Sequence, residues 1–231
     1  MGLLDIFTGD ALRIFGEAFS LKEVPADGYS RMRYPKWPVL MRFDVDRYEA
    51  AGFGHLMLMK TRAMGGVMNL VTASFTPNEG TEAPYLLIDM MKMGKKRTVF
   101  VEYYDCTGKS LRIPELDVVA AGYSDVPKYA EKPAWYIAER MPCSLIKGTA
   151  DGSEGRLLSM VRDSLAAYAA YCRTAPKDPE NLEGLRAFQS RMITEGNPSS
   201  GTMEKVLGKD GAEWFFQNVV MPVPKTQKQP R

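Results

Sequence analysis

The sequence is poor in the residues that build metal and nucleophilic centres. It has one histidine, His55, and three widely spaced cysteines, Cys106, Cys143 and Cys172. A single histidine excludes a histidine-based metal cluster and leaves little basis for a Ser-His-Asp arrangement. The cysteines form no CxxC pair and have no metal-ligand spacing, so we expect reduced thiols, no bound metal and a cytoplasmic protein.

Charge imbalance and long apolar runs are absent as well. The 231 residues carry 30 Lys and Arg against 28 Asp and Glu, which gives a net charge of +2. This balance offers no electrostatic argument for nucleic-acid binding. No apolar run reaches the roughly 18 residues needed to span a bilayer, so we expect no membrane partner. No GxGxxG follows an apolar run, so the dinucleotide-binding fingerprint is missing too.

The middle of the chain has the pattern of a β-sheet. Apolar or alternating runs predict strands at 39–46, 55–62, 67–75, 84–91 and 97–104. Gly65 and Gly66 form a hairpin signal between the second and third of these runs. The short connections indicate antiparallel neighbours.

Helices are predicted on either side of this β region. The first covers about 3–19, and the later ones cover 153–173, 178–195, 201–207 and 210–218, with a break at Gly208. Residues 105–155 are rich in loops and give no clear assignment. Strands followed by helices indicate an α+β fold, a three-layer α/β/α sandwich around a central antiparallel sheet. We expect one domain over 1–224 and a disordered basic tail over 225–231.

Asp89 stands alone in the apolar run 83–91. An ionised carboxylate buried in such a strand is costly, so it must be paired or protonated. One interpretation is that Asp89 caps the strand end and accepts backbone N–H bonds. The other is that it faces a cavity, where a raised pKa would make it a proton donor.

Two further patterns allow two interpretations each. The 15 methionines either fill an irregular core or line an adaptable apolar pocket. The turn containing Lys92, Lys95, Lys96 and Arg97 is either a solvated turn or a docking surface for an acidic partner.

Two segments together resemble the ferredoxin-dependent bilin reductases. The first, 72–77 followed by 82–89, is similar to the family's strand-turn-strand, in which an aspartate follows a proline by five residues, here Pro84 and Asp89. The second, 196–198 with 203–222, is similar to the C-terminal helical block of the family. The chain departs from the family where Thr72 replaces a frequent histidine, where Leu58 and Lys60 replace a histidine and a glutamate, and where Asn197 replaces an aspartate.

The resemblance implies a linear tetrapyrrole substrate, a biliverdin-like bilin, held between the sheet and the C-terminal helices. It implies no tightly bound cofactor, with reduced ferredoxin supplying single electrons in a radical mechanism and docking on the basic turn. Asp89 would be the central proton donor. The expected substrate-binding residues are Asn197, Thr72, Leu58, Lys60, Arg62 and Met91. The replaced residues leave a non-catalytic tetrapyrrole carrier as an alternative, and a pocket for another apolar ligand is a third possibility.

Overall fold

The computed structural model describes residues 2–36, 39–149 and 154–224. The segment 225–231, which we predicted to be a disordered tail, lies outside the described residues. None of the helices in the described part is long and apolar enough to cross a bilayer.

Eight strands form one antiparallel sheet in the order β1-β3-β4-β5-β6-β7-β8, and β2 also pairs with β3. Their bounds are β1 Leu21–Val24, β2 Arg31–Tyr34, β3 Met41–Ala50, β4 Gly54–Ala63, β5 Met68–Thr76, β6 Tyr85–Met93, β7 Lys96–Tyr104 and β8 Leu145–Thr149. The two short strands β1 and β2 pair with opposite ends of β3. Sequence neighbours are therefore sheet neighbours from β3 to β7, as the short connections predicted.

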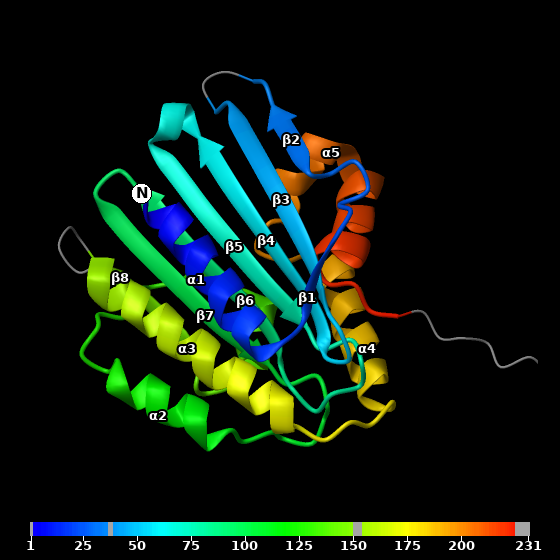
Figure 1. The fold of residues 1–231 in the computed structure, drawn as a ribbon. Helices are drawn as coiled ribbons and strands as arrows, with labels where there is room; N and C mark the ends of the chain where they lie inside the picture. The colour runs from blue at the N-terminus through cyan, green and yellow to red at the C-terminus, as the bar shows by residue number, and fades with distance from the viewer. Residues whose placement is uncertain (1, 37–38, 150–153, 225–231) are drawn as a thin grey trace, which may run out of the picture.

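Helices cover both faces of this sheet. Their bounds are α1 Leu3–Ala18, α2 Pro114–Gly122, α3 Glu154–Thr174, α4 Asn181–Thr194 and α5 Ser200–Phe215, followed by the short π-helical segment η3 Phe216–Val220. Figure 1 shows α1 and α3 across one face, with α2 packed outside α3, and α4 and α5 behind the sheet. The predicted three-layer α+β sandwich is confirmed.

The predicted elements from β3 to β7 and the predicted helices are present, with ends that differ by a few residues. The break at Gly208 is present as well, because this residue has φ 74° and ψ 170° inside α5. The sequence did not predict β1, β2, α2 or β8. The helix predicted from residue 178 begins at Asn181, and Asp178 accepts the Glu180 N–H in the preceding turn.

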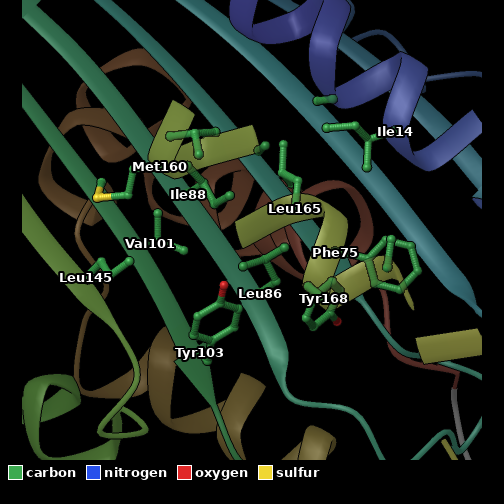
Figure 2. Close-up of a cluster of buried hydrophobic side chains, with 14 of the residues drawn as sticks. Ile14, Phe75, Leu86, Ile88, Val101, Tyr103, Leu145, Met160, Leu165 and Tyr168 are labelled. Atoms are coloured by element: carbon green, nitrogen blue, oxygen red, sulfur yellow. The ribbon is translucent and has the colours of Figure 1, made fainter. Parts of the chain in front are cut away.

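The face under α1 and α3 is a closed core. Leu86, Ile88 and Val101 project from the sheet toward Leu165 and Tyr168 of α3 (Figure 2). The Tyr168 hydroxyl is buried and donates to the Pro84 carbonyl at 2.7 Å, which satisfies the one polar atom that this side chain brings into the core.

The opposite face is covered by the helices of the C-terminal third. Alternation along β6 and β7 turns Tyr85, Leu87 and Tyr104 to this side, where they join Phe188 of α4 and Phe216 of η3 in a second cluster. Each strand therefore contributes to two apolar layers, and register decides which residue enters which layer.

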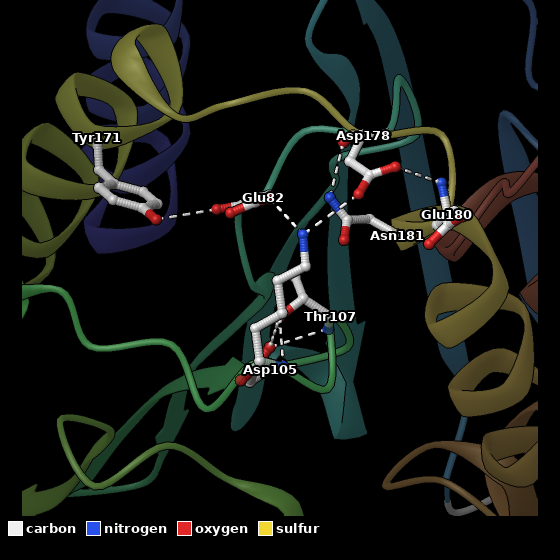
Figure 3. A network of polar contacts seen from close by, with 9 residues as sticks. Glu82, Asp105, Thr107, Tyr171, Asp178, Glu180 and Asn181 are labelled. Carbon is white, nitrogen blue, oxygen red and sulfur yellow. Dashed lines mark hydrogen bonds and ion pairs between the residues drawn. The ribbon is translucent and has the colours of Figure 1, made fainter.

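A polar network ties the start of α4 to the loop between β5 and β6 (Figure 3). Lys109 forms ion pairs with Glu82 and, at 3.3 Å, with Asp178. The Asn181 side chain donates to the Gly80 carbonyl at 3.0 Å, and the Tyr171 hydroxyl donates to the Glu82 carbonyl at 2.9 Å. These contacts fix where α4 leaves the α3 side and begins to cover the second face.

Gly184 lets α4 closely approach the segment that follows β7, because a Cβ at this position would collide with the Cys106 carbonyl oxygen. We expect Gly184→Ala to lower the free energy of unfolding by about 1–3 kcal/mol, since a backbone atom cannot move aside as a flexible side chain can. Urea denaturation measures this change.

Gly16→Ala is the matched control. Gly16 is an exposed α1 residue whose added Cβ would meet no atom within 4 Å. This substitution should raise stability by roughly 0.5–1 kcal/mol through helix propensity alone. Equal effects of the two substitutions would contradict the close approach of α4.

Candidate functional site

A cavity lies between the sheet and the C-terminal helices, on the face away from α1 and α3. Its volume is ≈ 190 Å³, which is smaller than the roughly 300–1,000 Å³ usual for small-molecule sites. The wall consists of Met41, Phe43, Met57, Met59, Thr61, Met68, Leu70, Thr72, Tyr85, Leu87, Asp89, Met192, Asn197, Pro198, Ser199, Thr202, Met203, Phe216 and Val220.

The wall is apolar and adaptable. Six of its nineteen residues are methionines. For these six, the interpretation that methionines line an adaptable apolar pocket is the one that fits. Asp89 is the one carboxyl side chain among these wall residues, and no Lys, Arg or His belongs to the set. Among the described residues, no group of three or more His, Cys, Asp or Glu is placed to hold a metal ion.

Asp89 lies in the middle of β6, directly opposite Thr72 of β5. Because both side chains point to the cavity face, the Thr72 hydroxyl donates to Asp89 Oδ1 at 2.5 Å. The strand-capping interpretation is therefore wrong, because Asp89 is not at a strand end and accepts its hydrogen bond from a hydroxyl rather than from a backbone N–H.

Burial raises the pKa of Asp89 from 3.8 to about 6, and the hydrogen bond from Thr72 opposes this rise. The side chain keeps some exposure because it faces the cavity. Its surroundings are protein on every other side, and the wall supplies no cation to stabilise the charged form. A weakly acidic carboxyl that faces an apolar cavity can donate a proton near neutral pH.

Two hydroxyl groups in the wall lack a hydrogen-bond partner. Thr61 Oγ1 and Tyr85 Oη are buried, and neither oxygen forms a hydrogen bond with any of the described residues. Both residues line the cavity. Buried polar atoms without a partner are uncommon, and a ligand in the cavity could reach these two oxygens only if the side chains moved.

Asn197 also lines the cavity, from the turn between α4 and α5. Its side-chain oxygen accepts the Ser199 N–H at 3.0 Å and the Ser199 hydroxyl at 2.9 Å, while its amide nitrogen donates to the Met192 carbonyl at 3.2 Å. The side chain therefore organises the turn. A contact of Asn197 or Thr72 with substrate stays a prediction.

Three predicted substrate contacts lie on the other face of the sheet. Leu58 is buried in the core under α1 and α3, Lys60 pairs with Asp5 at 3.7 Å, and Arg62 pairs with Asp44 at 3.4 Å. The prediction for these positions was wrong because β4 presents Met57, Met59 and Thr61 to the cavity, and alternate residues point the opposite way. Met91 lies on the cavity face of β6, but beyond the residues that line the cavity.

The basic turn is only partly available to a partner. Lys95 and Lys96 are exposed and Lys92 is half-buried. Arg97, however, is buried and pairs with Glu154 at 2.9 Å, at the start of α3. The expectation that Arg97 contributes to a docking surface is therefore wrong.

The sequence also held signals that we did not use. Glu102 is a lone acid in the apolar strand β7, the same signal that singled out Asp89. Thr61 and Tyr85 had no signal of their own, because a hydroxyl in a strand is ordinary until its partners are known.

The comparisons with known proteins reveal a structural likeness. A scan against protein-family models found no match, and a search of curated protein sequences found none. Among solved structures, the fold is similar to that of phytochromobilin synthase from tomato in complex with biliverdin, with a TM-score of 0.74 and 13% identity. The match covers 92% of this chain and 81% of that one. At this identity the likeness establishes the fold.

Asp89→Asn should change how stability depends on pH. Because the folded-state pKa is about 6 and the ordinary value is 3.8, the folded chain binds this proton more tightly than the unfolded chain does. The stabilisation that comes from this proton is complete below the ordinary pKa of 3.8 and is lost as the pH rises through about 6. The free energy of unfolding of Asp89→Asn, relative to wild type, should therefore increase by roughly 1–3 kcal/mol between about pH 4 and pH 8.

A matched pair at position 72 supplies the control for this titration. Thr72→Val removes the hydroxyl that lowers the pKa of Asp89, so the loss of stability should move to higher pH. Thr72→Ser keeps the hydroxyl and should follow wild type. Parallel pH curves for wild type and Asp89→Asn would show that the carboxyl ionises as it does in water.

Proposed function

We propose that this protein binds a linear tetrapyrrole of the biliverdin type in the cavity and reduces it, with Asp89 as the proton donor. The observation that carries the proposal is the position of Asp89, a buried carboxyl with a raised pKa in the wall of an apolar cavity. The fold is shared with a protein whose structure contains biliverdin.

The chemistry of the wall suits an open-chain tetrapyrrole. Such a pigment is a long conjugated chain of four rings, apolar on both faces and polar along its edge, where it carries ring N–H groups and terminal carbonyl oxygens. The methionines can follow its curved faces. Asp89 can accept hydrogen bonds from ring N–H groups or protonate the pigment.

The wall contains no basic residue, which restricts where the carboxylates of a ligand can lie. A carboxylate deep in the cavity would meet Asp89 and no cation among the wall residues, which is unfavourable. The propionates of a bilin must therefore lie at the mouth. Lys60 and Arg62, which we first expected to bind the substrate, lie on the opposite face of the sheet.

Electrons for the reduction would come from reduced ferredoxin, a small acidic protein. The exposed Lys95 and Lys96 provide complementary charge, and the neighbouring side chains Met93 and Val67 are 48% and 52% exposed. Met68 lines the cavity and is the cross-strand partner of Met93. A protein docked on this turn would be close to one end of the bound pigment.

Biliverdin binding and turnover test the proposal together. Mixing should shift the pigment absorption band, and reduced ferredoxin should then bleach or displace that band under anaerobic conditions. Asp89→Asn should bind with the same shift and lose at least roughly 100-fold in the rate of reduction, the usual range for removing a general acid. Lys60→Gln, on the far face, is the matched control and should behave as wild type.

Each alternative gives a different result. A shifted band that does not change on reduction in wild type would indicate a tetrapyrrole carrier, which the replacement of a family acid by Asn197 favours. Wild-type turnover by Asp89→Asn would remove this carboxyl from the mechanism. No shift on mixing would mean that the cavity holds a different apolar ligand.

The basic turn can be tested separately. Lys95→Glu combined with Lys96→Glu should raise the KM for ferredoxin about tenfold or more at low salt, because it reverses the charge at the docking surface, and it should leave biliverdin binding unchanged. Lys22→Glu, an exposed change on β1 at the other end of the sheet, is the control. Equal KM values for the two variants would exclude the turn as the docking site.

A further inference from the structure

A second acidic residue lies beside Asp89 without touching the cavity. Glu102 is on β7, where it pairs with Leu87, while Asp89 pairs with Phe100. Asp89 and Glu102 are thus diagonal neighbours on one face of adjacent strands, a relation that separates side chains by about 7–8 Å. Glu102 is 1% exposed, and it does not line the cavity.

The contacts of Glu102 converge on one of its oxygens. The Tyr104 hydroxyl donates to Oε1 at 2.9 Å, and the Arg140 guanidinium pairs with the same oxygen. Arg140 also forms two hydrogen bonds with Glu131, at 2.6 and 2.8 Å. Both contacts of Glu102 use Oε1, and among the described residues Glu102 Oε2 forms no hydrogen bond.

The charges in this cluster do not balance when every acid is ionised. Arg140 is shared by Glu102 and Glu131, and its bidentate contact with Glu131 already makes a neutral pair. An ionised Glu102 would add a surplus negative charge in a buried place, beside Asp89. The other titratable groups that face the cluster are Tyr85, Tyr104 and Tyr136.

The pKa of Glu102 agrees with this surplus of negative charge. Burial raises the pKa of Glu102 to about 7, Arg140 opposes the rise, and the charge of Asp89 adds to it. Burial also raises the pKa values of Tyr85, Tyr104 and Tyr136 above the normal value of 10, so these groups stay neutral.

We propose that Glu102 keeps a proton up to near-neutral pH and acts through Asp89 as a positioning residue, setting how readily Asp89 releases its own proton. While Glu102 is neutral, Asp89 can ionise without a second charge beside it. Once Asp89 has given its proton away, its negative charge holds the proton on Glu102 more tightly. The pair therefore titrates as a coupled unit with two apparent values.

The role in catalysis rests on the proposed function, but the state of the proton does not. The first test is therefore a carboxyl ¹³C NMR titration of the protein alone, without pigment. Glu102 should be protonated at pH 6 and ionise near pH 7, the value given by its surroundings. A Glu102 signal that is ionised throughout about pH 5–8 would overturn the proposal and leave a plain ion pair with Arg140.

Three variants show which charges hold the proton on Glu102. Asp89→Asn removes the neighbouring charge, and Glu131→Gln leaves Arg140 to Glu102 alone, so each should lower the apparent pKa of Glu102 by roughly one pH unit. Glu139→Gln is the control, because Glu139 pairs outward with Arg191 at 2.8 Å and should change nothing. An unchanged titration in Asp89→Asn would overturn the coupling.

Turnover with biliverdin gives the second readout. In wild type the rate of reduction should fall as the pH rises through about 7, because Glu102 then loses its proton. In Glu102→Gln, which cannot ionise, this fall should disappear and leave the fall near pH 6 that belongs to Asp89. A rate lowered equally at every pH would indicate structural damage alone and would overturn the link to Asp89.

Discussion

The architecture depends on a sheet whose central strands are apolar on both faces. β5, β6 and β7 alternate so that Leu86, Ile88 and Val101 enter one core while Tyr85 and Leu87 enter the other. Both faces must be covered, because exposing either would forfeit the hydrophobic free energy that drives folding. α1 and α3 close the first face by direct packing. α4 and α5 cover the second incompletely, and the space that they leave is the cavity.

Within that cavity, the position of one residue on β6, Asp89, determines where a proton donor can lie. A carboxyl at position 89 has to face the cavity, because the neighbouring positions 88 and 90 belong to the closed core. Burial then raises its pKa, and Thr72, placed opposite by the register of β5, limits the rise. The position of a proton donor thus follows from strand pairing, and Glu102 extends the same arrangement to the next strand.

Long apolar patterns predicted most of this fold, and short or partly polar patterns did not. The strands from β3 to β7 contain nine or ten residues each, enough for alternation to be visible. β1 and β2 contain four residues each. Lys22 and Glu23 in β1, and Arg31 and Arg33 in β2, are charged, so in sequence these strands resemble loops.

Side-chain direction was harder to predict than strand existence. β4 is buried on both faces from His55 to Met59, so its alternation could not show that Met59 rather than Leu58 faces the cavity, and a shift of one residue reverses every side chain. Arg97 looked free in sequence because its partner Glu154 is 57 residues away. The apolar segment around Asp89 indicated an unusual carboxyl, and only the tertiary structure showed that it lines a cavity.

The most direct test of the account is a crystal structure of the protein with biliverdin. The account predicts the pigment between the sheet and α4–α5, with ring nitrogen atoms within hydrogen-bonding distance of Asp89 and both propionates at the mouth. Biliverdin bound elsewhere on the protein, or in the cavity with a propionate turned toward Asp89, would contradict it.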